Sequence, residues 1–159
     1  MLMRKFYPAL FVFAPLLYAC SGTALQVHAR SATVVGSALS VARVGIRDSR
    51  VTAMREVELQ SVGSPDDVRL EAMDRVAERF APAVVSYNVV QLALDAWVNT
   101  LLILAADQAG DNIEEELLSA AAGLLRAWSP MVGALRPLGV EVPDLPAPLM
   151  SLFSEEGAE

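Results

Sequence analysis

The chain has few of the residues on which several kinds of site depend. Its 159 residues include one cysteine, Cys20, and one histidine, His28, and no lysine follows Lys5. One cysteine cannot form a disulfide within the chain. One histidine in a short tether cannot supply a multi-histidine metal site, and it cannot serve as the ordered base that histidine-dependent nucleophilic catalysis needs. A glycine-rich phosphate loop is also missing. The sequence therefore predicts no catalytic residue, no metal and no cofactor.

Positive charge is scarce as well. The formal net charge is −7, which argues against a nucleic-acid partner, whereas 54% hydrophobic residues exclude a disordered chain. Length predicts one domain. Removing residues 1–19 removes two basic residues and no acidic one, which brings the net charge to −9.

The first residues have the order of an export signal. Arg4 and Lys5 precede a run of apolar residues from Ala9 to Leu17, and small residues follow. The wider segment from Phe6 to Ala19 is interrupted by Pro8 and Pro15, and it is shorter than the ~20 residues that a membrane span needs. Residues 1–19 are therefore predicted to be a cleaved signal peptide.

The end of this segment, Leu17-Tyr18-Ala19-Cys20, resembles the lipobox of bacterial lipoproteins. The resemblance implies that Cys20 receives a lipid, becomes the first residue of the mature chain and holds it to a membrane, with residues 20–24 as a tether. Ser21, in place of the aspartate associated with inner-membrane retention, favours the outer membrane. An alternative is ordinary cleavage near Ala24, which gives a soluble secreted protein.

The body of the chain is predicted to be helical, with its first helix from Leu25 to about Val62. Val35, Leu39, Ala42 and Ile46 recur on one face of this helix. Gly36 and Gly45 mark a bend or the close approach of another helix.

The segment Gly63-Ser64-Pro65-Asp66-Asp67 predicts a break and a new helix start. The two aspartates suit the positive end of a helix better than a metal site. Pro82 is expected to end or kink this second helix, whose apolar edge is Leu70, Met73, Ala77 and Phe80 and which carries a surface ion pair between Glu71 and Arg75.

Residues 81–106 carry a single charge, Asp95. Asn88, Gln91, Asp95 and Asn99 recur at three, four and four residues, which places them in one sector of a helix and defines the polar seam. We expect a central bundle helix that is buried around most of its circumference, with Trp97 and Trp128 in the core; a lipid-contacting span is the alternative.

A last helix is expected to begin at Asp111, where Glu114 completes a capping box, and to end at Pro137-Leu138-Gly139. Pro130 is expected to kink this helix or to start a short new one. Residues 140–159 contain Pro143, Pro146 and Pro148 and are predicted to be an extended, partly disordered tail. The expected fold is therefore all-α: roughly a four-helix bundle over residues 25–139.

Residues 20–55 carry five arginines and a single acidic residue, a net charge of +4, and Arg43, Arg47 and Arg50 among them form the basic stripe. A solvated face is one reading, a surface near anionic headgroups another. Because a buried charge is costly unless paired, Arg43 or Arg47 is the expected partner of Asp95.

These features favour a lipid-anchored cell-envelope protein that faces the periplasm or the exterior and acts by binding, not by catalysis. Its partners would be the membrane, through the lipid, and an envelope protein. The alternative is a carrier or sensor that holds an apolar ligand between helices.

Overall fold

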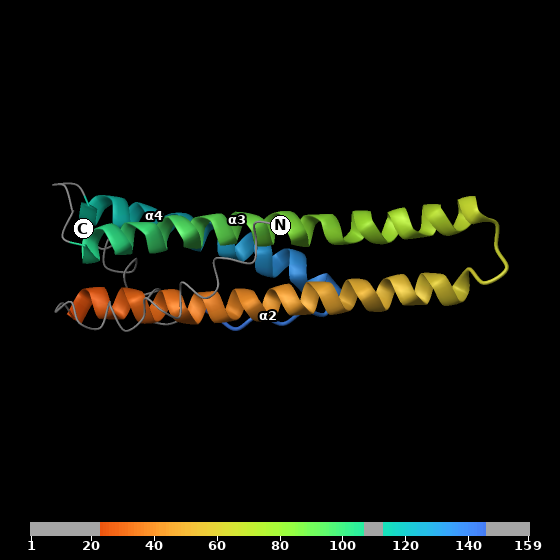
Figure 1. The fold of residues 1–159 in the computed structure, drawn as a ribbon, viewed down its shortest axis with the longest axis horizontal. Helices are drawn as coiled ribbons and strands as arrows, with labels where there is room; N and C mark the ends of the chain where they lie inside the picture. The colour runs from red at the N-terminus through yellow and green to blue at the C-terminus, as the bar shows by residue number, and fades with distance from the viewer. Residues whose placement is uncertain (1–22, 107–112, 146–159) are drawn as a thin grey trace. The chain divides into compact units, whose positions relative to one another are not determined.

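The computed structural model describes residues 23–106 and 113–145, in which all regular structure is helical. The helices are α2 (Thr23–Gln60), α3 (Asp66–Ala105) and α4 (Ile113–Leu135), followed by a short 3-10 helix, η1 (Arg136–Leu138) (Figure 1). The predicted all-α fold is confirmed. The predicted signal peptide, Cys20, the capping box at Asp111 and the tail beyond residue 145 lie outside the described residues.

The described residues fall into two compact units, and each unit takes a part of all three helices. The first contains residues 23–37, 93–106 and 113–124, and the second contains Ala38–Leu92 and Leu125–Pro143. In the first unit, the buried apolar side chains come from matching faces of α2, α3 and α4: Ala32, Val35, Leu94, Trp97, Leu101, Leu117, Ala121 and Leu124. Trp97 is confirmed as a core residue.

In the second unit, α2 and α3 run antiparallel from the turn that joins them (Figure 1). Gly63 has a φ of 81°, a left-handed conformation that glycine adopts without a steric penalty. The carbonyl of Pro65 accepts the first helical hydrogen bond of α3, from the Arg69 amide at 3.2 Å. The predicted break and new helix start are thus confirmed.

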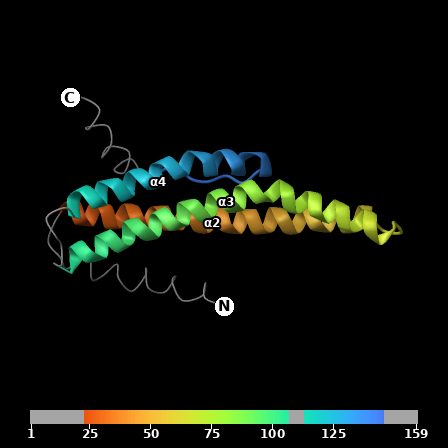
Figure 2. The same ribbon diagram turned by 90° about the horizontal axis from the view of Figure 1, so that it is seen from above.

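The core of the second unit includes most of the apolar face that the sequence predicts for α2. Its larger buried side chains are Leu39, Ile46, Phe80, Val90, Trp128, Met131 and Leu135. Trp128 is therefore a core residue, as expected. Figure 2 shows α4 on one side of α2 and α3, and α4 does not extend to the turn. Near the turn, α2 and α3 are the helices of the described residues that pack together. Along the predicted apolar edge of the second helix, Phe80 is buried, Met73 and Ala77 are half-buried, and Leu70 is 58% exposed.

The end of η1, which directly follows α4, is closed by a left-handed glycine. Gly139 has a φ of 68°, its amide donates to the Arg136 carbonyl at 3.1 Å, and the Val140 amide donates to the Leu135 carbonyl at 3.3 Å. This pair of bonds is the Schellman arrangement, which satisfies carbonyls at a helix end. The chain then crosses α2, where Val140 packs on Gly45 and the Ser49 hydroxyl donates to the Leu138 carbonyl at 3.3 Å. Gly45 therefore permits close approach, but of an extended segment and not of a helix.

Of the two outcomes that the sequence predicts at Pro82, a helix end or a kink, the helix end is wrong. Pro82 lies inside α3 and Pro130 inside α4. Two predicted helices, one on each side of Pro82, are therefore a single helix. A proline removes one backbone hydrogen bond, and the apolar contacts on both sides of it offset that loss, with Phe80 and Ala83 buried around Pro82.

Candidate interaction surface

An apolar stripe on α3 faces away from the core of the second unit. It consists of Val85, Val89 and Leu92, which are 61%, 49% and 69% exposed. Their spacing of four and three residues puts them on one line along the helix, as in the seam of a coiled coil. We call these three residues the α3 stripe.

This exposure corrects the expectation of a central helix that is buried around most of its circumference. Val90, Leu94, Trp97 and Leu101 form a narrow buried face, and the opposite side of α3 is open in the described part of the chain. The sequence pattern could not show this, because an apolar residue on a helix reads the same whether another helix of the chain covers it or not.

The polar seam borders the α3 stripe. Asn88 and Asn99 are exposed, and Gln91 and Asp95 are half-buried. The Tyr87 hydroxyl lies 3.4 Å from Gln91 Oε1 and donates to it, which holds the amide one turn along the helix. The seam is thus a partly hydrated flank of α3 and not a shielded polar core.

The basic stripe lies on α2 in the second unit, and Arg43, Arg47 and Arg50 are all exposed. Arg47 pairs with Asp48 at 3.1 Å, with 76% of the arginine side chain exposed. A fully buried ion pair of Asp95 with Arg43 or Arg47 is therefore wrong, because neither arginine is shielded from water.

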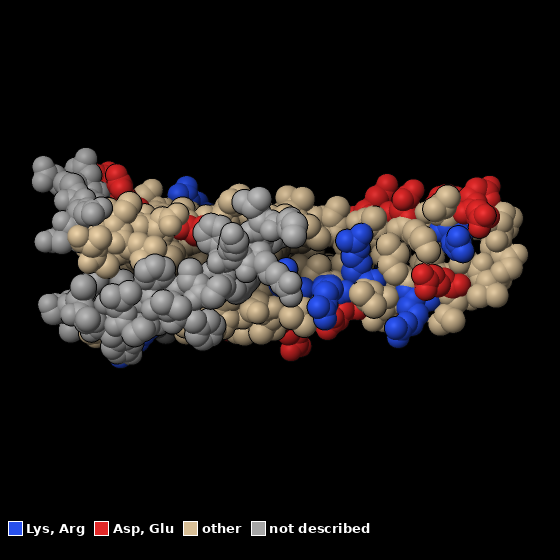
Figure 3. Space-filling model, viewed as in Figure 1, with Lys and Arg blue, Asp and Glu red and all other residues tan. Residues whose placement is uncertain are grey.

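Charged side chains on the face seen in Figure 3 gather over the part of α2 and α3 near the turn. The predicted pair of Glu71 with Arg75 is confirmed at 3.0 Å, and Asp66 pairs with Arg69 at 3.5 Å. Exposed pairs of this kind contribute about 0 to 1 kcal/mol each. Asp66 therefore stabilises the first turn of α3 through its pair with Arg69. Among the described residues, no cluster of His, Cys, Asp or Glu could hold a metal ion.

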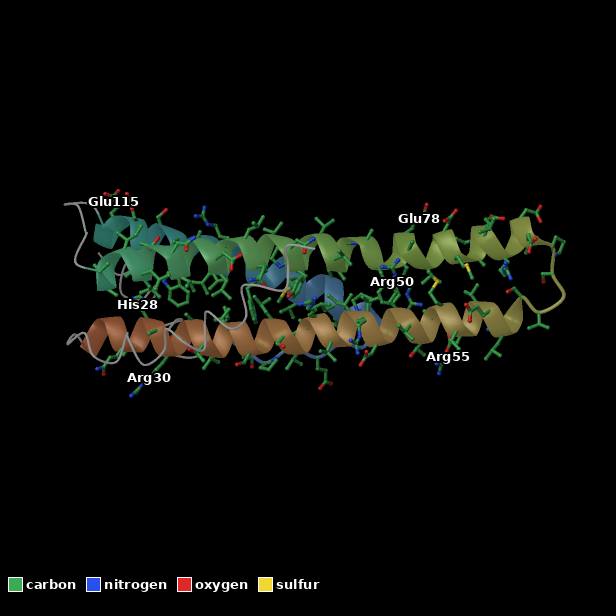
Figure 4. The ribbon with its side chains drawn as sticks, in the orientation of Figure 1. His28, Arg30, Arg50, Arg55, Glu78 and Glu115 are labelled. Carbon is green, nitrogen blue, oxygen red and sulfur yellow. The ribbon has the colours of Figure 1, made fainter. Side chains whose placement is uncertain are left out.

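His28 occupies a formed part of the structure, which corrects its expected place in a mobile tether. It lies in α2, seven residues before Val35, and is 6% exposed. In Figure 4 its side chain lies between α2 and α3, whereas Arg30 points outward. The heptad spacing from Val35 was the sequence signal that places it on the buried face.

α3 is long and apolar enough to cross a membrane, and it is the one helix of the described part for which this holds. Its most apolar 18-residue window has a mean hydropathy of 1.4, and 22% of that window is buried. Comparison with protein-family models, with curated proteins and with solved structures finds no match to this chain.

Proposed function

We propose that the chain is a lipid-anchored protein of the cell envelope that acts by binding another protein. Cys20, in a segment that resembles a lipobox, is the proposed attachment site. One acyl chain gives marginal membrane binding of ~10⁴ M⁻¹, so the several chains of a mature lipoprotein make attachment durable. The residue after the cysteine favours the outer membrane, with the body facing the periplasm or the exterior.

The α3 stripe is the proposed contact surface, and its exposure is the observation that carries the proposal. Leu92 alone is 69% exposed on an otherwise well-formed helix. Large apolar side chains that line up on a surface, with polar neighbours beside them, mark places where proteins associate. The function supported best is therefore a non-catalytic interaction module.

The chemistry of the stripe suits an apolar seam on a helix of the partner. A line of residues at four and three spacing is narrower than the face that a globular core needs, and it matches the seam of paired helices. Asn88 is exposed beside it, and Glu78 and Arg79, less than two turns before Val85, are also exposed. These polar groups are costly in contact with hydrocarbon and are tolerated at the rim of a protein interface.

A partner helix on the α3 stripe would also bring the number of packed helices to four. The complex would then contain three helices of this chain and one of the partner, whereas the sequence predicts roughly four helices within residues 25–139 of this chain. Residues 140–159 are proposed to form an extended tail, since Pro143, Pro146 and Pro148 disfavour helix.

Site-specific photocrosslinking in native membranes tests this proposal. A photoreactive residue at position 89 should give one discrete protein adduct, and the same residue at position 59 should not. Leu59 is a suitable control because it is 70% exposed and lies on α2. Adducts with lipid alone, or none, at position 89 would contradict the proposal.

Leu92→Glu should weaken capture of the partner by about thirtyfold or more, because a contact residue at the centre of an interface contributes ~2 kcal/mol or more. The same change at Leu59 matches it in chemistry and exposure and should leave capture unchanged. Both variants should unfold within about 0.5 kcal/mol of the parent, since surface substitutions rarely exceed that. Equal loss of capture in the two variants would argue against the stripe.

Cys20→Ser should abolish incorporation of a labelled acyl chain and leave the protein unprocessed or misrouted, because the thiol is the atom that is acylated in bacterial lipoproteins. Metabolic labelling followed by fractionation measures both effects. Ser21→Ala, which keeps the thiol, is the control and should retain the label. A parent protein that takes up no label and leaves membranes in high salt would refute the anchor.

A further inference from the structure

His28 is a buried imidazole with an unsatisfied ring nitrogen. It is 6% exposed, and its Nδ1 atom is buried and has no hydrogen-bond partner among the described residues. Such a group is rare in a well-packed interior, because an unpaired polar atom is costly there. The cost rises steeply if the ring also carries a charge.

The imidazole packs against Trp97 of α3. The two ring centroids are 5.8 Å apart and the ring planes meet at 77°, an edge arrangement. Trp97 is fully buried, and within the described part of the chain its Nε1 atom also has no hydrogen-bond partner. This contact joins α2 to α3 in the first unit between residues 69 positions apart in the sequence.

The other described ionisable groups of this unit do not surround the imidazole. Arg30 and Glu115 point outward in Figure 4, and Glu116 and Asp144 are exposed. Asp95 of α3 is half-buried and lies two residues from Trp97, a separation that turns it about 200° around the helix axis. Its carboxylate is therefore directed away from the face that holds Trp97.

We propose that His28 makes the packing of α2 on α3 in the first unit sensitive to pH. Protonation of the imidazole puts a positive charge among apolar side chains and beside the indole, and the contact loosens. Attraction between a cation and an aromatic ring offsets only part of the lost hydration. Both helices stay formed, and the contact between them weakens as the medium becomes acidic.

The direction of the effect follows from burial, which lowers the pKa of His28 below its ordinary value of 6.5. The unfolded chain then takes up a proton before the folded chain does. The titration of His28 leaves the free energy of unfolding unchanged above about pH 6.5. That free energy decreases as the pH falls from 6.5 toward the pKa of His28 in the folded chain. Within that window the unfolding equilibrium constant rises about tenfold per pH unit.

Denaturant unfolding of the full chain, purified without a histidine tag, tests this between pH 8 and pH 5. His28→Gln removes the titrating group, and every carboxylate is unchanged. The parent should lose stability more steeply than this variant below pH 6.5, by up to tenfold in the unfolding constant per unit. Equal slopes in the two proteins would overturn the proposal.

A second measurement does not depend on how well that variant folds. His28 is the sole histidine, so its C2 proton can be followed by NMR in the parent protein. Trp128→Phe leaves Trp97 as the sole tryptophan, and its fluorescence reports the contact. Both signals should change together with a midpoint below 6.5; a histidine midpoint at or above 6.5, or a Trp97 signal that does not follow it, would overturn the proposal.

Discussion

Trp97→Ala is expected to lower the free energy of unfolding by about 3 to 5 kcal/mol, the largest effect of any single core change proposed for this chain. Trp97 has no exposed surface and is the largest fully buried side chain in the described residues. Removing the indole forfeits its burial and leaves a cavity that the surrounding helices fill only in part. A loss of this size is a large share of the 5 to 15 kcal/mol that holds a typical domain together.

Chemical denaturation monitored by circular dichroism measures this loss. Val89→Ala is the matched control on the same helix, since Val89 is 49% exposed and its truncation should change stability by about 0.5 kcal/mol or less. Trp97→Phe should recover part of the loss because it keeps a ring in the core. A Trp97→Ala protein within 1 kcal/mol of the parent would show that the end of α3 does not pack as described.

Gly45→Ala is expected to be less stable than Gly36→Ala by about 1 to 3 kcal/mol, although both changes are made inside α2. A Cβ atom at position 45 would lie 2.5 Å from Val140 Cγ1, too close for either atom to stay in place. A Cβ atom at position 36 meets its nearest neighbour, Leu94 Cδ2, at 4.0 Å, which is ordinary contact.

The comparison isolates packing because both substitutions gain the same helix propensity, ~1 kcal/mol for alanine over glycine. Gly36→Ala should therefore stabilise the protein by up to that amount, and Gly45→Ala should lose the gain to the clash. Val140→Ala in the Gly45→Ala background should relieve the clash and narrow the gap. If the two alanine variants have equal unfolding midpoints, the segment after η1 does not rest on α2.

The parts of the fold that were predictable are those that depend on local chemistry. The face formed by Val35, Leu39, Ala42 and Ile46 follows from helical spacing, and all four side chains are buried. The turn before α3 follows from glycine and proline at fixed positions, and the Glu71 to Arg75 pair follows from a separation of four residues.

The parts that were not predictable depend on what packs against what. Pro82 weakens a helix locally, but whether the helix continues depends on tertiary contacts on both sides of the residue. The α3 stripe consists of apolar residues, as does the buried face on the opposite side of the helix, so helical spacing alone could not tell the exposed face from the buried one. Its spacing was visible, but its exposure depends on where α4 lies, which no local pattern specifies.

His28 illustrates the same limit for the polar residues. A histidine eight residues after the proposed lipid attachment was assigned to a tether by its position, although its spacing from Val35 places it on the buried face. The basic stripe and the polar seam were placed on the right helices, because period and composition decide that. The degree of burial of these side chains was not predictable, since it depends on neighbours that are distant in the chain.

Each unit is built from parts of all three helices, and this limits where residues can be inserted or deleted. Within the second unit, α2 contributes Leu39, Ala42 and Ile46 to the core, and all three side chains are buried. One residue inserted between them would turn everything beyond it by 100° and take a core face out of register. The turn at residues 61–65 is mostly exposed and has no such register to keep. Insertions and deletions should therefore accumulate at the turn between α2 and α3, and the helices should keep their lengths.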